Sequence, residues 1–228
     1  MRGGETADNP DGWGLAYLEG DAFAIHKAPE AAARSASFAK LAQQIHSRLI
    51  IAHVRKANPP TAHTLENTHP FMRTCCDRHW VFAHNGQVPE VVAPQGCCHP
   101  RHSSPGGETD SEHAFIYLLE EIAGTFPGAP PATMDAWFET LAMRSAAIAE
   151  YGQFNFLMSE GEHLIAYGHD RLHSQQRIED GVQSVLIASV PLTGDESWEA
   201  FAPDELRVYR SGRLLGRWSG ATSAITLP

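Results

Sequence analysis

The sequence predicts an α+β fold in which sheets are covered by helices. Short apolar runs of strand length occupy both ends of the 228-residue chain, and two longer stretches with helical spacing, residues 109–123 and 133–151, are grouped between them. The composition is 43% hydrophobic, which allows a sizeable core, and no repeat, linker or low-complexity tract divides the chain. We therefore expect residues 1–228 to form a single domain.

The first part of the chain predicts a hairpin, a helix and a buried strand. Residues 15–18 and 22–26 are apolar runs on either side of a short Gly-containing turn. Residues 31–46 place apolar side chains at helical intervals, so this helix should pack on a sheet. The near-continuous apolar run 49–54 predicts a strand that is buried on both faces and carries Arg55 at its end.

The rest of the chain adds a strand, the two long helices and a run of further strands. An apolar strand at 79–84 ends in Asn85-Gly86, and Thr109-Asp110-Ser111-Glu112 has the form of a capping box that opens the helix 109–123. The helix 133–151 follows. After it we expect strands at residues 154–158, 163–167, 185–189, 206–210 and 214–218.

Composition argues against several classes of partner. The chain carries 17 Lys+Arg against 27 Asp+Glu, a net charge of −10, which repels nucleic acid and anionic lipid. It has no apolar run near the roughly 20 residues that cross a bilayer and no export signal at its start. Its four cysteines form two adjacent pairs, Cys75-Cys76 and Cys97-Cys98, in a chain that can fold without bridges. We expect a cytoplasmic protein without nucleic-acid or membrane partners.

Three polar positions at strand or helix ends could form a site. Each has a structural explanation: Arg55 as a solvated strand end, Asn85-Gly86 as a hairpin turn, Asp110 as a complement to a helix dipole. Their chemistry also suits an amino acid that carries an amide. A guanidinium pairs with an α-carboxylate, a carboxylate accepts an α-ammonium group, and an Asn amide beside a Gly N–H supplies two donors for a developing oxyanion.

The order of the motifs strengthens the functional interpretation. Four stretches closely resemble the class II glutamine amidotransferases: His53-Val54-Arg55-Lys56-Ala57-Asn58, Glu66-Asn67-Thr68-His69-Pro70-Phe71, Phe82-Ala83-His84-Asn85-Gly86-Gln87 and Gly107-Glu108-Thr109-Asp110-Ser111-Glu112. Three others resemble its small single-domain branch: Asn9-Pro10-Asp11-Gly12-Trp13-Gly14, Gln153-Phe154-Asn155-Phe156-Leu157 and Pro191-Leu192-Thr193-Gly194. The resemblance spans nearly the whole chain.

This resemblance implies an N-terminal nucleophile hydrolase fold, a four-layer α/β/β/α sandwich of two antiparallel sheets. It implies that Arg55 holds the α-carboxylate of glutamine, Asp110 its α-amino group, and Asn85 with Gly86 the oxyanion, while His69 supports the pocket. The activity implied is hydrolysis of the glutamine side-chain amide through a cysteine thioester, with ammonia passed to an acceptor that the sequence does not identify. No cofactor or metal is expected, and a homo-oligomer or a synthetase partner is compatible with the resemblance.

The family's nucleophile is a cysteine exposed as the first residue after Met removal, and its α-amino group serves as the base. Here Met1 is followed by Arg2, so we expect this sequence to be truncated at its N-terminus and inactive as written. An internal cysteine would need a new base and a different position. Two alternatives remain open: a glutamine-binding protein without catalysis, and a metal-binding protein that uses the Cys- and His-rich residues 97–102.

Overall fold

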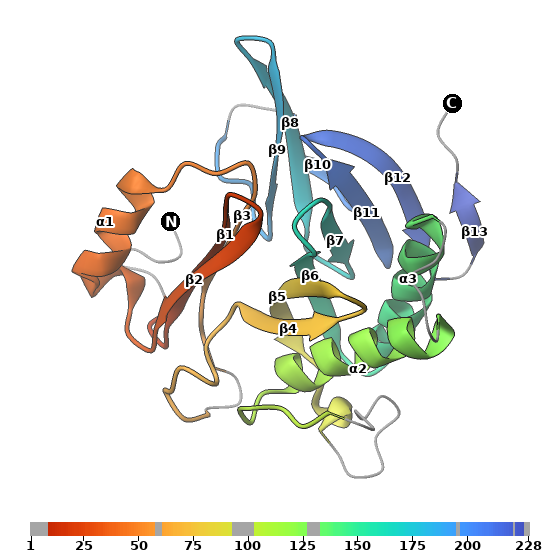
Figure 1. The fold of residues 1–228 in the computed structure, drawn as a ribbon, viewed down its shortest axis with the longest axis horizontal. Helices are drawn as coiled ribbons and strands as arrows, with labels where there is room; N and C mark the ends of the chain where they lie inside the picture. Colours follow the sequence, from red (N-terminus) through yellow and green to blue (C-terminus); the bar gives the residue numbers. More distant parts are fainter. Residues whose placement is uncertain are drawn as a thin grey trace.

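The computed structural model describes residues 9–57, 61–92, 103–126, 133–194, 197–220 and 222–225 (Figure 1). Its elements, in chain order, are β1 (Trp13–Glu19), β2 (Ala22–Ala28), η1 (Ala32–Arg34), α1 (Ala36–Gln44), β3 (Ile50–Val54), β4 (Phe71–Cys75), β5 (Arg78–Gln87), η2 (Pro89–Val91), α2 (Asp110–Thr125), α3 (Asp135–Ala149), β6 (Gln153–Ser159), β7 (Leu164–Gly168), β8 (His173–Glu179), β9 (Val182–Ala188), β10 (Glu199–Ala200), β11 (Glu205–Arg210), β12 (Arg213–Ser219) and β13 (Thr222–Ile225). The expected α+β class, with antiparallel sheets and few helices, is confirmed.

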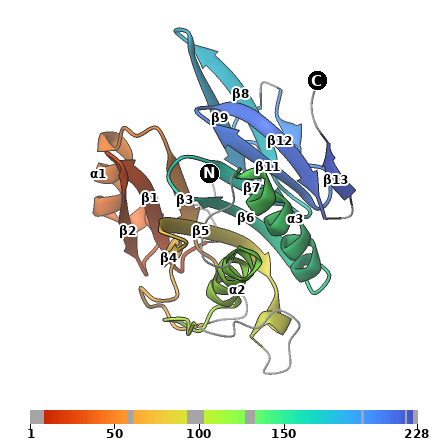
Figure 2. The same ribbon diagram turned by 45° about the vertical axis from the view of Figure 1, so that its right-hand side comes forward.

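A seven-stranded antiparallel sheet, in the order β13-β12-β11-β7-β6-β5-β4, forms the centre of the molecule. Helices α2 and α3 cover one of its faces (Figures 1 and 2). The largest hydrophobic cluster lies between them, where Phe82 of β5 stacks on Phe115 of α2 with ring centroids 4.9 Å apart, and Trp137 of α3 contacts Trp80. Burial of these large aromatic side chains supplies the main hydrophobic driving force for this half of the fold.

The opposite face of the central sheet packs on a second layer of strands. Alternation along β5 shows the arrangement, because Trp80 and Phe82 face the helices whereas Val81 and Ala83 face Ile51 of β3 and the small sheet β2-β1-β3. Helix α1 then packs on the far side of this small sheet. The described elements thus form helix, sheet, sheet and helix layers, as the resemblance implied.

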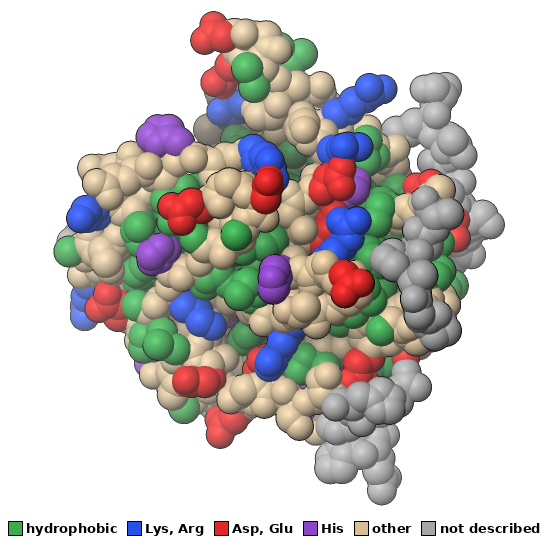
Figure 3. Space-filling model, viewed as in Figure 1, with side chains coloured by type: hydrophobic (Ala, Val, Ile, Leu, Met, Phe, Trp, Pro, Cys, Tyr) green, Lys and Arg blue, Asp and Glu red, His purple; other side chains and the backbone are tan. Residues whose placement is uncertain are grey.

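The second layer contains a further small sheet, β10-β8-β9. Arg207 of β11 attaches it to the central sheet: this side chain is 1% exposed, donates to Ser174 Oγ of β8 at 3.0 Å and to Glu205 Oε2 at 2.9 Å, and lies over the Phe201 ring. Figure 3 shows the β8–β9 hairpin projecting from the top of the molecule, with hydrophobic as well as acidic side chains on it. Its tip contributes little to the core, since Ile178 is 75% exposed.

Two expectations for individual strands are wrong. The run 49–54 is not buried on both faces, because α1 covers the outer face of β3 at its Val54 end and leaves Ile50 43% exposed; among the described strands β3 is an edge strand that pairs with β1. The hairpin-turn alternative for Asn85-Gly86 also fails: both residues continue β5, where Asn85 pairs with Asn155 and Gly86 with Phe154 of β6. Local sequence does not determine these outcomes, because the neighbouring strand decides them.

The helices agree with the sequence more closely. Thr109 caps α2 by accepting a hydrogen bond from the Glu112 backbone N–H at 3.3 Å, and the apolar side of α2 is buried as its spacing indicates. The reciprocal half of the capping box does not form, because the Glu112 carboxylate instead accepts from the Gly107 N–H at 2.8 Å and from Arg73. Among the described residues, no helix is both long and apolar enough to cross a membrane.

Candidate functional site

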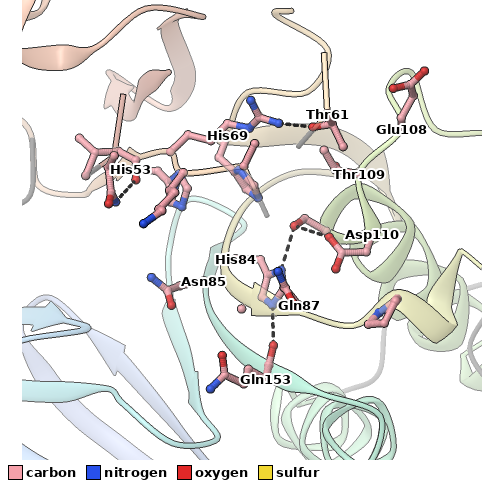
Figure 4. A pocket seen from close by; sticks show the side chains of 18 of the residues that line it. His53, Thr61, His69, His84, Asn85, Gln87, Glu108, Thr109, Asp110 and Gln153 are labelled. Carbon is pink, nitrogen blue, oxygen red and sulfur yellow. Dashed lines mark hydrogen bonds between the residues drawn. The ribbon is translucent and has the colours of Figure 1, made fainter. Parts of the chain in front are cut away.

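A cavity of about 410 Å³ opens where β3 and β5 end and where β6 and α2 begin. All five residues singled out by sequence line it: Arg55, His69, Asn85, Gly86 and Asp110. They come from segments far apart in the chain. Figure 4 shows the labelled His69, Asn85 and Asp110 around one hollow, with Thr61 and Glu108 on its upper side and Gln153 on its lower side. The fold therefore places the predicted residues at a single site.

Arg55 is 3% exposed and held in place by the N-terminal segment. Its backbone N–H donates to Gly12 O at 2.8 Å, and its Nη1 donates to Asp11 O at 3.3 Å, while its Nη2 contacts the Thr61 hydroxyl. Burial lowers the pKa of the guanidinium, and the nearby Asp11 carboxylate partly offsets this effect. The described contacts are to neutral oxygens, so the cationic fork keeps its capacity to pair with a carboxylate.

Asp11 in turn organises the loop after β3. Its Oδ2 accepts from the Ala57 backbone N–H at 2.7 Å, and Asn9 Nδ2 donates to Val54 O at 3.0 Å. These contacts explain why the Asn-Pro-Asp-Gly motif belongs to the site although it lies more than forty residues from Arg55 in the sequence. Sequence reasoning noted this motif but assigned it no role.

Gly86 allows two strands to approach closely at the site. Its φ is +151°, and an added Cβ would lie 1.8 Å from Gln153 O of β6, so no side chain fits there. Asn85 precedes it on the half-buried inner side of β5, and its backbone oxygen accepts from Asn155 Nδ2 at 3.1 Å. The Asn side chain and a Gly backbone N–H thus lie next to each other at the cavity wall, as two donors for an oxyanion would require.

A hydrogen-bond chain connects α2 with β5 and β6. His84 Nε2 lies 3.1 Å from Gln153 O, and His84 Nδ1 lies 2.8 Å from Ser111 Oγ, which is also 3.2 Å from Asp110 Oδ1. Asp110 Oδ2 accepts from the Val88 backbone N–H at 2.7 Å. Figure 4 shows this chain as dashed lines beside the labelled Asp110.

Counting hydrogens along this chain determines what Asp110 can bind. Burial lowers the pKa of His84, which favours the neutral ring and its single N–H. The Gln153 carbonyl can only accept, so Nε2 carries that hydrogen and Nδ1 can only accept. The single hydroxyl hydrogen of Ser111 lies within reach of both His84 Nδ1 and Asp110 Oδ1, to which Ser111 Oγ donates at 3.2 Å. A carboxylate oxygen can accept two hydrogen bonds, so Oδ1 of Asp110 can also accept from a ligand, such as an ammonium group.

Two further imidazoles line the cavity. The rings of His53 and His69 lie 4.3 Å apart, and burial lowers the pKa of His53 to about 4 and that of His69 well below its ordinary value. Both rings are therefore neutral at pH 7. His53 Nδ1 and both nitrogens of His69 are buried and have no hydrogen-bond partner among the described residues. They are polar atoms that a bound molecule can satisfy.

The loop that carries His69 is tied to both sides of the cavity. Lys27 Nζ donates to Thr68 O at 2.8 Å, and Asn67, which is 2% exposed, accepts from the Glu108 N–H at 2.8 Å. A Cβ on Gly107 would lie 2.4 Å from Asn67 Oδ1, so glycine is needed where the two loops meet. The Asn-Thr-His-Pro and Gly-Glu-Thr-Asp motifs are thus one structural unit.

The described lining of the cavity contains no cysteine. Cys75 ends β4 and Cys76 follows it in the turn to β5. Their sulfurs lie 2.8 Å apart and pack against the main core, and Cys75 Sγ donates to Leu119 O. Cys97, Cys98 and the rest of the 97–102 segment lie outside the described residues. The metal-binding alternative for that segment therefore stays a prediction.

Sequence reasoning missed a buried asparagine that builds one edge of the site. Asn155 is fully buried, and its Oδ1 accepts from the backbone N–H groups of His169, Asp170 and Arg171 at 2.9, 3.1 and 3.3 Å. Its Nδ2 donates to Asn85 O and to Asp170 Oδ1. This residue lies within one of the motifs, but an Asn in the middle of a strand gives no local signal of the turn that it holds.

A family model for class II glutamine amidotransferases matches residues 1–180 of the chain. The chain belongs to this family. The Escherichia coli (strain K12) protein named "Putative glutamine amidotransferase YafJ" is 35% identical over 235 residues, which cover 93% of this chain and 89% of the relative. A Mycobacterium tuberculosis (strain H37Rv) protein named "Gamma-glutamyl-hercynylcysteine sulfoxide hydrolase" is 29% identical over 190 residues, covering 83% and 71% of the two chains.

Solved structures agree with this membership. The crystal structure of a predicted glutamine amidotransferase from Pseudomonas aeruginosa PA01 superposes with a TM-score of 0.70 at 29% identity, covering 94% of this amidotransferase and 90% of the other chain. The N-terminal nucleophile hydrolase-like sandwich is thus shared with a member of the same family. The resemblance on which the sequence analysis relied is confirmed.

Proposed function

We propose that this class II glutamine amidotransferase binds L-glutamine in the cavity and, when a terminal cysteine thiol is present there, hydrolyses its side-chain amide to glutamate and ammonia. The observation that carries this proposal is the convergence of Arg55, Asp110 and the Asn85-Gly86 pair on one cavity. A cation, an acceptor and a pair of oxyanion donors match the three polar groups of glutamine that must be held during attack on the γ-carbonyl.

The proposed roles follow from the chemistry of each group. Arg55 pairs with the α-carboxylate, and Oδ1 of Asp110, which keeps a second acceptor position beside its hydrogen bond from Ser111, accepts from the α-ammonium group. Attack of a thiolate on the γ-carbonyl places negative charge on its oxygen, toward which Asn85 Nδ2 and the Gly86 N–H would donate. The terminal α-amino group, which took the thiol proton, returns it to the leaving nitrogen as the intermediate collapses, so the C–N bond breaks, ammonia is released and a thioester remains. Water then hydrolyses the thioester to glutamate and the free thiol.

The binding step is tested by isothermal titration calorimetry with L-glutamine. We expect Arg55→Ala and Asp110→Ala each to weaken binding at least tenfold, since a charge-assisted hydrogen bond contributes about 1.5–3 kcal/mol. Arg48→Ala is the matched control, because Arg48 is an exposed arginine that contacts Asp21 far from the cavity. Binding that is unchanged in both pocket variants would refute the assignment of this cavity.

The chemical step is tested by comparing the 228-residue chain with a variant extended at its N-terminus so that Met removal exposes a cysteine. We expect the extended form to release ammonia from glutamine and to be labelled at that cysteine by a glutamine-like electrophile. Labelling of the 228-residue form at an internal cysteine would show that the nucleophile is assigned wrongly. Glutamine binding without ammonia release in the extended form would favour the alternative, a glutamine-binding protein without catalysis.

A further inference from the structure

A second arginine lies at the edge of the cavity, beside the oxyanion residues. Arg171 follows β7 and lines the cavity together with Gln153, Asn85 and Gly86, whereas Arg55 reaches it from the end of β3. The proposed roles do not use Arg171. Asn155 joins the Arg171 backbone to Asn85, and Asn85 and Gly86 are the residues assigned to the γ-carbonyl, so we place Arg171 on the amide side of the ligand.

The turn that carries Arg171 is held firmly in place. The three backbone N–H groups of residues 169–171 donate to the single Oδ1 atom of Asn155, and Asn155 Nδ2 donates to Asn85 O at 3.1 Å. Asn155 thus connects the Arg171 turn directly to the strand that carries the oxyanion donors. A buried amide whose donors and acceptor are all used fixes the relative position of the two segments.

The side chain of Arg171 is also pre-oriented. Its Nε and Nη2 donate to Asp170 Oδ1 and Oδ2 at 3.1 and 3.0 Å, while Gln153 Nε2 and Asn155 Nδ2 donate to the same carboxylate. The pairing raises the pKa of Arg171, which stays cationic. Its Nη1 has no acceptor among the described residues, so these hydrogens are available to a ligand. The Asp170 charge moderates the attraction without removing this directed donor.

We propose that Arg171 forms a subsite for a carboxylate on the amine side of the scissile amide, so that the cavity accepts γ-glutamyl amides of amino acids as well as glutamine. This inference rests on the proposed function, because it places the γ-glutamyl part of the ligand as glutamine is placed. The cavity volume of about 410 Å³ is consistent with it, since pockets of about 300–1,000 Å³ accommodate ligands larger than one amino acid.

The test compares two ligands of nearly equal size. γ-L-Glutamylglycine carries a carboxylate on its amine side, whereas γ-L-glutamylethylamide carries a methyl group there. We expect calorimetry to show that the unmodified chain binds the glycine derivative about tenfold more tightly than the ethylamide. Arg171→Gln should remove this preference and leave the affinity for L-glutamine unchanged. Arg213→Gln, which alters an exposed arginine on β12, should retain the preference.

The outcomes separate this inference from the proposed function. Equal affinities for the two derivatives in the unmodified chain, together with normal glutamine binding, would overturn the Arg171 subsite alone. A loss of affinity in Arg171→Gln that is equal for all three ligands would also overturn it, because it would indicate general damage to the cavity. Failure of the unmodified chain to bind glutamine at all would refute the proposed function and this inference with it.

Discussion

Acid should destabilise this protein through the buried histidines of the cavity, and His53 gives the effect a magnitude. Burial lowers the pKa of His53 from 6.5 to about 4, a difference of 2.5 units. One pKa unit corresponds to about 1.4 kcal/mol. Protonation of His53 in the unfolded chain therefore lowers the free energy of unfolding by at most about 3 kcal/mol. This loss of stability is absent above pH 6.5, grows as the pH falls from 6.5 to 4, and is constant below pH 4.

The assay is urea unfolding followed by tryptophan fluorescence at a series of pH values between 7.5 and 4.5. Between pH 6 and pH 4.5, the free energy of unfolding of the unmodified chain should fall as the pH decreases. In His53→Gln this fall should be smaller by up to about 1.4 kcal/mol per pH unit, since the glutamine side chain takes up no proton. The control His46→Gln alters an exposed histidine after α1 and should leave the pH dependence unchanged. An identical acid dependence in His53→Gln and the unmodified chain would refute the argument that a neutral, buried His53 limits stability.

Two further predictions concern the fold. Gly86→Ala should prevent the β5–β6 pairing, because its Cβ would lie 1.8 Å from Gln153 O, whereas Gly124→Ala, with no atom within 4 Å, should stabilise α2 by about 0.5–1 kcal/mol. Circular dichroism melting curves compare the two, and a stable Gly86→Ala protein would contradict the packing described. Arg207→Met should lower the free energy of unfolding, measured in urea, by about 3 kcal/mol, because it removes the buried arginine that pairs with Glu205. We expect a value at the low end of the cost of breaking a buried ion pair, since a second arginine still contacts Glu205. A loss of unfolding free energy below about 1 kcal/mol would contradict this prediction.

The success of the sequence predictions varied with the kind of element. The helix after Thr109 and the strands β6, β7, β11 and β12 were predicted because their hydrophobic periodicity is strong and local. The strand β8, with the sequence His-Ser-Gln-Gln-Arg-Ile-Glu, was missed, as were β4, β10 and β13. β8 is held by main-chain pairing with β9 and by the contact of Arg207 with Ser174, and neither leaves an apolar pattern in its own residues.

The same distinction applies to the site. Arg55, His69, Asn85, Gly86 and Asp110 were selected from residue chemistry and motif order, and the structure brings all five to one cavity. His84 and Ser111 lie inside the same motifs, yet their significance depends on how one hydroxyl hydrogen is shared across two elements. Arg171 belongs to a turn whose position is set by hydrogen bonds to the side chain of Asn155 in β6, which sequence spacing does not predict.

By itself, the sequence determined the family, the order of the main helices and strands, and the types of group that could hold an amino acid. The Asn85-Gly86 sequence is locally compatible with a turn and with a strand. The tertiary structure alone decided that it forms a strand, because both residues pair with β6. It also decided that the Val88 N–H and the Ser111 hydroxyl hold the Asp110 carboxylate and that a second arginine reaches the cavity. These properties depend on distances between segments far apart in the chain, and such distances exist only once the layers have packed.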